Sequence, residues 1–208
     1  MKETEDYEKD LASIRSIMER SVKFISLSGL SGVLSGVYAL IGAGIAYQAI
    51  YYPLPPFGYF HASILDHPSS IFKLELTALI VLLASLITGF LMSLRKAKKL
   101  ETSLWNATSK QLFKDLMISL GTGGLFIVLL LLREYYILLA PACLIFYGLA
   151  LIQASRSTYA EVMYLGLTEI ILGLVAAAFP GYGLILWATG FGVMHIVYGA
   201  VMYFRYEG

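Results

Sequence analysis

Residues 159–204 read YAEVMYLGLTEIILGLVAAAFPGYGLILWATGFGVMHIVYGAVMYF. This stretch consists of two apolar segments joined by a Pro-Gly-Tyr-Gly turn at residues 180–183, and each segment is long enough to cross about 30 Å of hydrocarbon as an α-helix. The segments are interrupted by few ionisable residues, namely Glu161, Glu169 and His195. The stretch therefore predicts a helical hairpin that spans a membrane and holds ionisable side chains in its interior.

The rest of the chain has the same apolar character. Of its 208 residues, 58% are hydrophobic and only 14% are charged, which is typical of integral membrane proteins and not of soluble domains. The sequence predicts an all-α, polytopic fold of six transmembrane helices, at residues 24–52, 76–94, 116–132, 136–155, 159–179 and 184–204. It divides into an N-terminal segment of residues 1–23 and a transmembrane domain of residues 24–208.

The Lys and Arg residues predict the orientation of these spans, because short loops rich in them stay on the cytoplasmic side. Such residues cluster before the first span and between the second and third spans. The opposite side holds Lys73 and Arg133, whereas Arg156 and Arg205 fall again on the basic side. We therefore predict a multi-pass protein of the inner (plasma) membrane with both termini in the cytoplasm.

Residues 1–23 carry apolar side chains at intervals of three and four, which predicts a cytoplasmic amphipathic helix. Its basic residues favour binding to anionic lipids at the cytoplasmic face of the bilayer. Alternatively, the apolar face pairs with a neighbouring subunit. We predict that the protein forms a homo-oligomer, and a scaffold function would add a cytoplasmic protein partner recruited by this helix. Nucleic acid is not an expected partner, because the net charge is only +1 and the basic residues lie between spans.

Glycine residues recur at related positions in the spans. Near its basic end, each even-numbered span has a Gly that is followed by an Arg. These glycines are Gly89, Gly148 and Gly199. This pattern fits three helical hairpins of the same orientation, with a possible pseudo-threefold repeat, and a chance origin fits it equally well. Small residues mark the faces on which membrane helices pack, and the packing candidates are Gly32, Gly36, Gly173 and Gly199.

Glu169 and His195 are the candidate functional residues. Each lies about thirteen residues from the middle of the 180–183 turn, so both are about 20 Å deep, near the bilayer midplane. Small residues share a helix face with each of them, and the two side chains can touch if these faces oppose each other. Placing a lone carboxylate at that depth costs at least about a few kcal/mol. A partner side chain or a bound ion has to offset this cost. Candidate neighbouring hydroxyls are those of Thr168, Tyr198, Tyr147 and Tyr164.

Three interpretations of this pair remain open: a structural hydrogen-bonded pair, a site that handles a proton or small ion, and a metal site with a further ligand. No cofactor, metal or enzymatic activity is predicted, because the chain has no phosphate loop, His-Glu-x-x-His or nucleophile elbow. His61, Asp66 and His67 form only a weak metal pattern. The preferred hypothesis is passage or sensing of a proton or small ion or solute, by a transporter, channel or sensor. The alternative is a non-transporting, stress-related accessory or scaffold protein.

Residues 165–199, with a Gly-bearing helix, a Pro turn and a second Gly-bearing helix, resemble the hairpin repeat of the HdeD-type bacterial membrane proteins. Those proteins carry this hairpin three times over six spans. The resemblance implies a small inner-membrane protein tied to acid or envelope stress, with no catalytic residues to transfer. Two departures are that the second hairpin lacks a Pro-Gly turn and that the first has a long outer loop in its place.

Overall fold

The computed structural model describes residues 28–52, 55–56, 68–99 and 107–207. The elements in these residues are α2 (Gly29–Ile50), α3 (Pro68–Lys99), α4 (Ala107–Leu132), η2 (Tyr136–Leu138), α5 (Leu139–Ala154), α6 (Glu161–Ala178), α7 (Gly183–Trp187), the π-helical segment η3 (Ala188–Met194) and α8 (His195–Tyr206). All of them are helical.

Six helices within the described residues are long and apolar enough to cross a membrane, and the last of them, Gly183–Tyr206, comprises α7, η3 and α8. This confirms the predicted fold class: the protein is a multi-pass, all-α membrane protein whose helices contact the lipid bilayer. The predicted amphipathic helix of residues 1–23 lies outside the described residues, as do His61, Asp66 and His67.

Some helices continue well beyond the predicted apolar runs. The second run was predicted at residues 76–94, but α3 begins at Pro68 and ends at Lys99. Similarly, the third run starts at residue 116, whereas α4 begins at Ala107. The additional turns are rich in Lys, and a helix continues through such residues because their charged ends reach water. Hydropathy therefore locates the hydrocarbon crossing and not the end of the helix.

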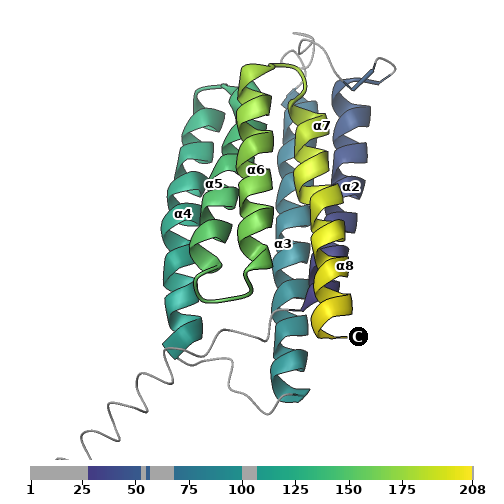
Figure 1. Cartoon of the computed structure of the whole chain (residues 1–208). Helices are drawn as coiled ribbons and strands as arrows, with labels where there is room; N and C mark the ends of the chain where they lie inside the picture. Colours follow the sequence, from purple (N-terminus) through teal and green to yellow (C-terminus); the bar gives the residue numbers. More distant parts are fainter. Residues whose placement is uncertain (1–27, 53–54, 57–67, 100–106, 208) are drawn as a thin grey trace, which may run out of the picture.

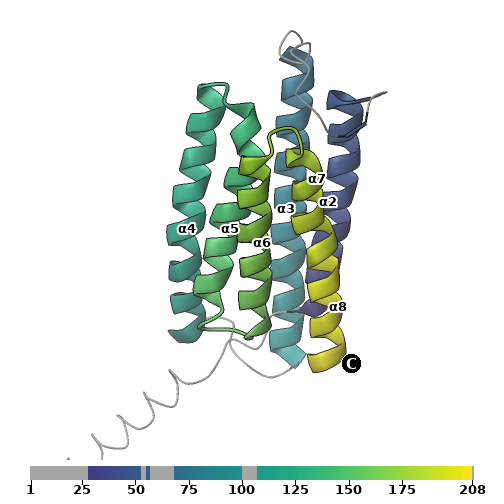
Figure 2. The same ribbon diagram turned by 45° about the horizontal axis from the view of Figure 1, so that its top comes forward.

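The helices run side by side along the length of the molecule (Figure 1). In one group α5 packs between α4 and α6, and in the other α2 packs between α3 and α8. The segments α7 and η3 join the groups, since both contact α6 and α2. Figure 2 shows α4, α5 and α6 together on one side, with α2 and α8 on the other. The functional candidates on α6 and α8 therefore lie where the two groups meet.

Two helix crossings use glycine in the same way. A Cβ atom on Gly148 of α5 would lie 2.6 Å from the carbonyl oxygen of Gly166 on α6. A Cβ atom on Gly36 of α2 would lie 2.6 Å from the carbonyl oxygen of Gly192 in η3. In both cases the same Cβ would lie 2.7 Å from the Cγ1 of an isoleucine on the opposite helix. Only glycine allows backbones to approach this closely, so these residues permit the close α5–α6 and α2–α8 pairs.

The two remaining long helices, α3 and α4, do not cross each other through glycine in this way. Within the described residues these two helices have no packed interface with each other. A Cβ atom on Gly89 of α3 or on Gly124 of α4 would meet no described atom within 4 Å. The large apolar side chains of α3 and α4 are mostly exposed, and in a membrane they face lipid.

The small faces of the fifth and sixth spans do not oppose each other, although their apposition was the condition under which Glu169 and His195 were expected to touch. Gly173 of α6 packs against Leu144 and Ile145 of α5, whereas Gly199 of α8 packs against the backbone of α2, beside Gly32. Each glycine face accommodates one closely approaching helix, and here the occupants are α5 and α2. Consequently α6 and α8 meet through other side chains.

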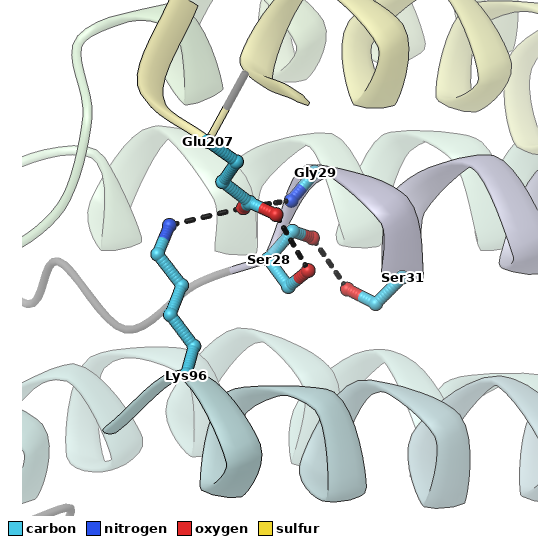
Figure 3. A network of polar contacts seen from close by, with 5 residues as sticks. All are labelled: Ser28, Gly29, Ser31, Lys96 and Glu207. Atoms are coloured by element: carbon cyan, nitrogen blue, oxygen red, sulfur yellow. Dashed lines mark hydrogen bonds and ion pairs between the residues drawn. The ribbon is translucent and has the colours of Figure 1, made fainter. Parts of the chain in front are cut away.

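The end of the described chain is tied to the start of α2 (Figure 3). The carboxylate of Glu207 accepts hydrogen bonds from the Gly29 amide at 2.7 Å and from the Ser28 hydroxyl at 3.2 Å. It also pairs with Lys96 Nζ of α3 at 3.0 Å. A carboxylate suits this position because it satisfies an N–H group that has no partner within the helix. We call this end of the bundle, which carries Ser28, Glu207 and the 155–160 turn, the terminal end.

Candidate functional site

Glu169 and His195 lie against each other in the interior of the bundle. Oε1 of Glu169 is 3.4 Å from Nδ1 of His195. Glu169 is 0% exposed and His195 is 6% exposed. The first comes from the middle of α6 and the second is the first residue of α8. The structure therefore brings together an acid and an imidazole, drawn from the two groups of helices.

Hydrogen bonds hold the His195 ring at both nitrogens. Nδ1 is 3.0 Å from the carbonyl oxygen of Gly190, and Nε2 is 2.8 Å from the hydroxyl of Tyr147. A carbonyl oxygen can only accept, so we assign the ring proton to Nδ1, and Nε2 of the neutral ring then accepts from Tyr147. Phe191 stacks on the ring at a centroid distance of 5.8 Å and an angle of 20°. The orientation of the imidazole is thus fixed.

The carboxyl group of Glu169 has no hydrogen-bond donor among the described residues. Its closest approach to His195 is longer than an ordinary N–H···O bond, because the Nδ1 proton is directed at Gly190. Leaving a buried carboxylate without donors costs more than the roughly 1–3 kcal/mol of an unpaired neutral group. A bound proton, a cation or a charged imidazole has to compensate it. In this conformation Glu169 and His195 are neighbours without an ordinary hydrogen bond between them.

The space around the carboxyl group is tightly filled. A Cβ atom on Gly190 would overlap Oε2 of Glu169 and lie 2.7 Å from Cδ2 of Leu144, which is itself 0% exposed. Only glycine permits the backbone of η3 to approach the carboxyl group in this way. In this conformation Glu169 has no contact with the surface, so exchange with solvent needs side chains to move.

The π-helical segment η3 ends directly before His195 and contains Gly190 and Gly192. π-helical turns are rare and often occur at functional sites. Here the segment presents the Gly190 carbonyl to the imidazole five residues later. Gly190 is a site residue that the sequence analysis missed, because a backbone acceptor has no side-chain signature. The available signal was its position within a Gly-x-Gly sequence just before His195.

Two of the predicted hydroxyl neighbours do not reach the pair. The hydroxyl of Thr168 donates to the carbonyl of Tyr164 on its own helix at 2.9 Å. Adjacent helix positions point about 100° apart, so Thr168 cannot follow Glu169 into the interior. Tyr164 is 64% exposed and faces the lipid. Tyr147 contacts His195 directly, whereas the hydroxyl of Tyr198 is buried without a hydrogen-bond partner among the described residues.

A metal site has little support from the donor set. Among the described residues no group of three or more His, Cys, Asp or Glu side chains could hold a metal ion. Within that part of the chain, the metal interpretation of Glu169 and His195 lacks a third carboxylate, imidazole or thiolate.

Comparison of the chain with protein-family models, with curated proteins and with solved structures found no match. A function therefore has to be inferred from the geometry of the Glu169 and His195 site.

Proposed function

We propose that this membrane protein binds and releases a proton at Glu169 and His195, and thereby senses or passes protons in the bilayer. The supporting observation is the buried carboxyl group without hydrogen-bond donors. Donors would hold such a group permanently as a carboxylate. Without such donors, the charge of the carboxylate is compensated by a proton or a cation that can bind and dissociate.

His195 is placed to exchange that proton. Its Nδ1 nitrogen is 3.4 Å from Glu169 Oε1, so a small approach of the two side chains brings the groups into transfer distance. Its Nε2 is already in contact with Tyr147. When the ring carries two protons, Nε2 has to donate, and the Tyr147 hydroxyl then accepts and turns its own proton elsewhere. Protonation at the centre therefore changes the hydrogen bonds around it.

The alternative function, a stress-related accessory or scaffold protein, is favoured by the tight packing. Glu169 is 0% exposed, and a Cβ atom would not fit at Gly190. In that case the pair would hold α6 against α8 and would keep one protonation state. The HdeD-type resemblance would assign either function to acid or envelope stress.

The two functions differ in whether Glu169 titrates in the folded protein. Infrared difference spectra of the reconstituted protein, recorded between about pH 4 and pH 9, detect the C=O stretch of a protonated carboxyl group. We expect a pH-dependent band that Glu169→Gln removes and that Glu75→Gln, a change at an exposed position of α3, leaves in place. If Glu169→Gln leaves the whole difference spectrum unaltered, the proton-binding function is wrong and the scaffold function is supported.

Flux measurements then separate passage from sensing. The wild-type protein is reconstituted into liposomes with a pH-sensitive dye inside, and a proton gradient is applied. Flux that is lost in Glu169→Gln indicates passage. A Glu169 band without any such flux indicates a sensor.

A further inference from the structure

Tyr147 connects the buried centre to the rest of the interior. Its hydroxyl is 2.8 Å from His195 Nε2, and it interacts electrostatically with both Glu169 and Tyr198. Among the elements packed around the centre, α7 and η3 contain no titratable side chain. The titratable groups that face one another there are Glu169 of α6, His195 of α8 and Tyr147 of α5.

Tyr198 lies one turn further along α8, toward the terminal end. Its hydroxyl oxygen is buried and has no hydrogen-bond partner among the described residues. Leaving a hydroxyl buried in this way is unfavourable, and buried tyrosines usually avoid the cost by bonding to a neighbour. On α8 it lies three residues after His195 and eight before Tyr206, so the three side chains share one helix face. Electrostatic interactions with Tyr147 and with Glu161 and Tyr206 agree with this position. Tyr198 thus stands between the centre and the terminal end.

Glu161 and Tyr206 lie where this row of groups meets the surface. The Tyr206 hydroxyl donates to Oε1 of Glu161 at 2.9 Å, and Arg205 Nη1 is 2.8 Å from the same oxygen. The other oxygen, Oε2, is buried without a hydrogen-bond partner among the described residues. The side chain of Glu161 is 17% exposed and that of Arg205 is 64% exposed. One carboxylate oxygen is therefore bonded at the surface while the other is buried.

The opposite side of the centre is apolar. Between Glu169 and the turn at residues 180–183, α6 carries only apolar side chains and glycine. On this side Leu144 of α5 is 0% exposed and Ala176 of α6 itself is 2% exposed. The hydroxyl of Thr189 on η3 donates to the carbonyl of Ile185 on its own helix. Along the described residues of α6 and η3 on this side, no free hydroxyl or carboxyl group is available to a proton that leaves Glu169.

From this asymmetry we infer that the centre exchanges protons with the terminal end alone, through Glu161, Tyr198 and Tyr147. The inference rests on the proposed function and specifies the side of the membrane whose pH sets the protonation of Glu169. From His195 to Tyr206 the route follows eleven residues of α8, about 16 Å. If the basic residues mark the cytoplasmic side, the protein senses cytoplasmic pH.

The transfer conserves protons at each step. Because the Tyr198 hydroxyl has no hydrogen-bond partner among the described residues, it first has to move into contact with Glu161 and with Tyr147. Glu161, protonated from solvent, then gives a proton to the oxygen of Tyr198, and Tyr198 passes its own hydroxyl proton to Tyr147. Tyr147 in turn gives its proton to Nε2 of His195, which releases its Nδ1 proton to Glu169. Each hydroxyl gains one proton as it loses one, so no tyrosinate accumulates. The net change is one proton moved from Glu161 to Glu169, with His195 left protonated on Nε2 in place of Nδ1.

The experiment follows the protonation of Glu169 after a pH jump on one side of the membrane. The full chain is reconstituted in one orientation in liposomes, with impermeant buffer on the other side. The time-resolved Glu169 band is assigned by its absence in Glu169→Gln. A jump at the terminal end should protonate Glu169, and a jump at the opposite side should not do so on the same time scale.

The variant Tyr198→Phe removes one hydroxyl and keeps the ring. We expect it to slow protonation about 10-fold or more while the final band amplitude stays unchanged, because the route and not the site is altered. The matched control is Tyr203→Phe, on the same helix at a 39% exposed position, and its rate should equal that of the wild type. If Tyr198→Phe does not fold, Glu161→Gln makes the same test at the entrance.

Several results would overturn the route. Equal rates after jumps on the two sides would do so, as would an unaltered rate in folded Tyr198→Phe or, in its place, folded Glu161→Gln. In each of these cases the Glu169 band persists, so the proton-binding function survives. Absence of any Glu169 band in the wild type would refute both the route and the function.

Discussion

Replacing Glu169 with methionine is expected to make the protein more stable. The Glu169 side chain is fully buried and its two oxygens have no hydrogen-bond donor among the described residues. Its possible ionic partner, Nδ1 of His195, is 3.4 Å away and donates to Gly190 instead. Methionine has a similar length and no group that needs hydrogen bonds. Removing an unpaired buried carboxyl group should therefore raise the free energy of unfolding by about 1–3 kcal/mol.

The measurement is equilibrium unfolding in mixed detergent micelles, followed by far-ultraviolet circular dichroism. Glu169→Gln keeps the shape of the side chain and removes its charge, so its stability should lie between those of the wild type and Glu169→Met. If the acid and the imidazole instead form a strong ion pair, removing one partner should destabilise the protein by about 3–5 kcal/mol. A loss of that size in Glu169→Met would refute the reasoning.

Two further predictions concern the end of α4 and the contact between α5 and α6. Glu134 has a φ of 60°, a left-handed conformation that favours glycine, so Glu134→Gly should stabilise the end of α4 by up to about 1 kcal/mol. Glu134→Ala, which keeps a Cβ atom, should give no such gain in the same unfolding assay. Gly148→Val should destabilise the protein by at least about 1–3 kcal/mol, because a side chain there collides with the backbone of α6. Gly124→Val, at an open position of α4, should change the free energy of unfolding by less than about 0.5 kcal/mol, and similar losses in the two valine variants would contradict the helix pairing.

The number and approximate positions of the spans could be predicted because hydropathy records directly which residues face hydrocarbon. The pairing of the helices could not. Gly199 and Gly173 both mark contact faces, but glycine does not specify which helix approaches it. Gly199 packs on α2, more than 150 residues earlier in the chain, and Gly173 packs on α5. The sequence left open that the two faces would meet each other.

The position of the site was accessible from the sequence for a simple reason. Glu169 and His195 are about equally far from one turn, and the constant helical rise places them at one depth. Their surroundings depend on tertiary packing. Tyr147 comes from α5, and the second bond to the imidazole comes from a backbone carbonyl at Gly190. Neither contact follows from a local pattern, whereas Thr168, the neighbour of Glu169 in sequence, faces away.

The contact between α2 and α8 also imposes an order on biosynthesis. The glycines of α2, such as Gly29 and Gly36, fit against the backbone of the last span, and the Gly29 amide is held by Glu207. When the ribosome has completed α2, about 150 residues remain to be translated, which takes roughly 10 s or more. During that interval the first helix waits in the bilayer without its partner. A nascent chain that stops before α7 would have inserted five spans. However, the glycines of α2 would have no helix packed against them, and the acid on α6 would have no imidazole beside it.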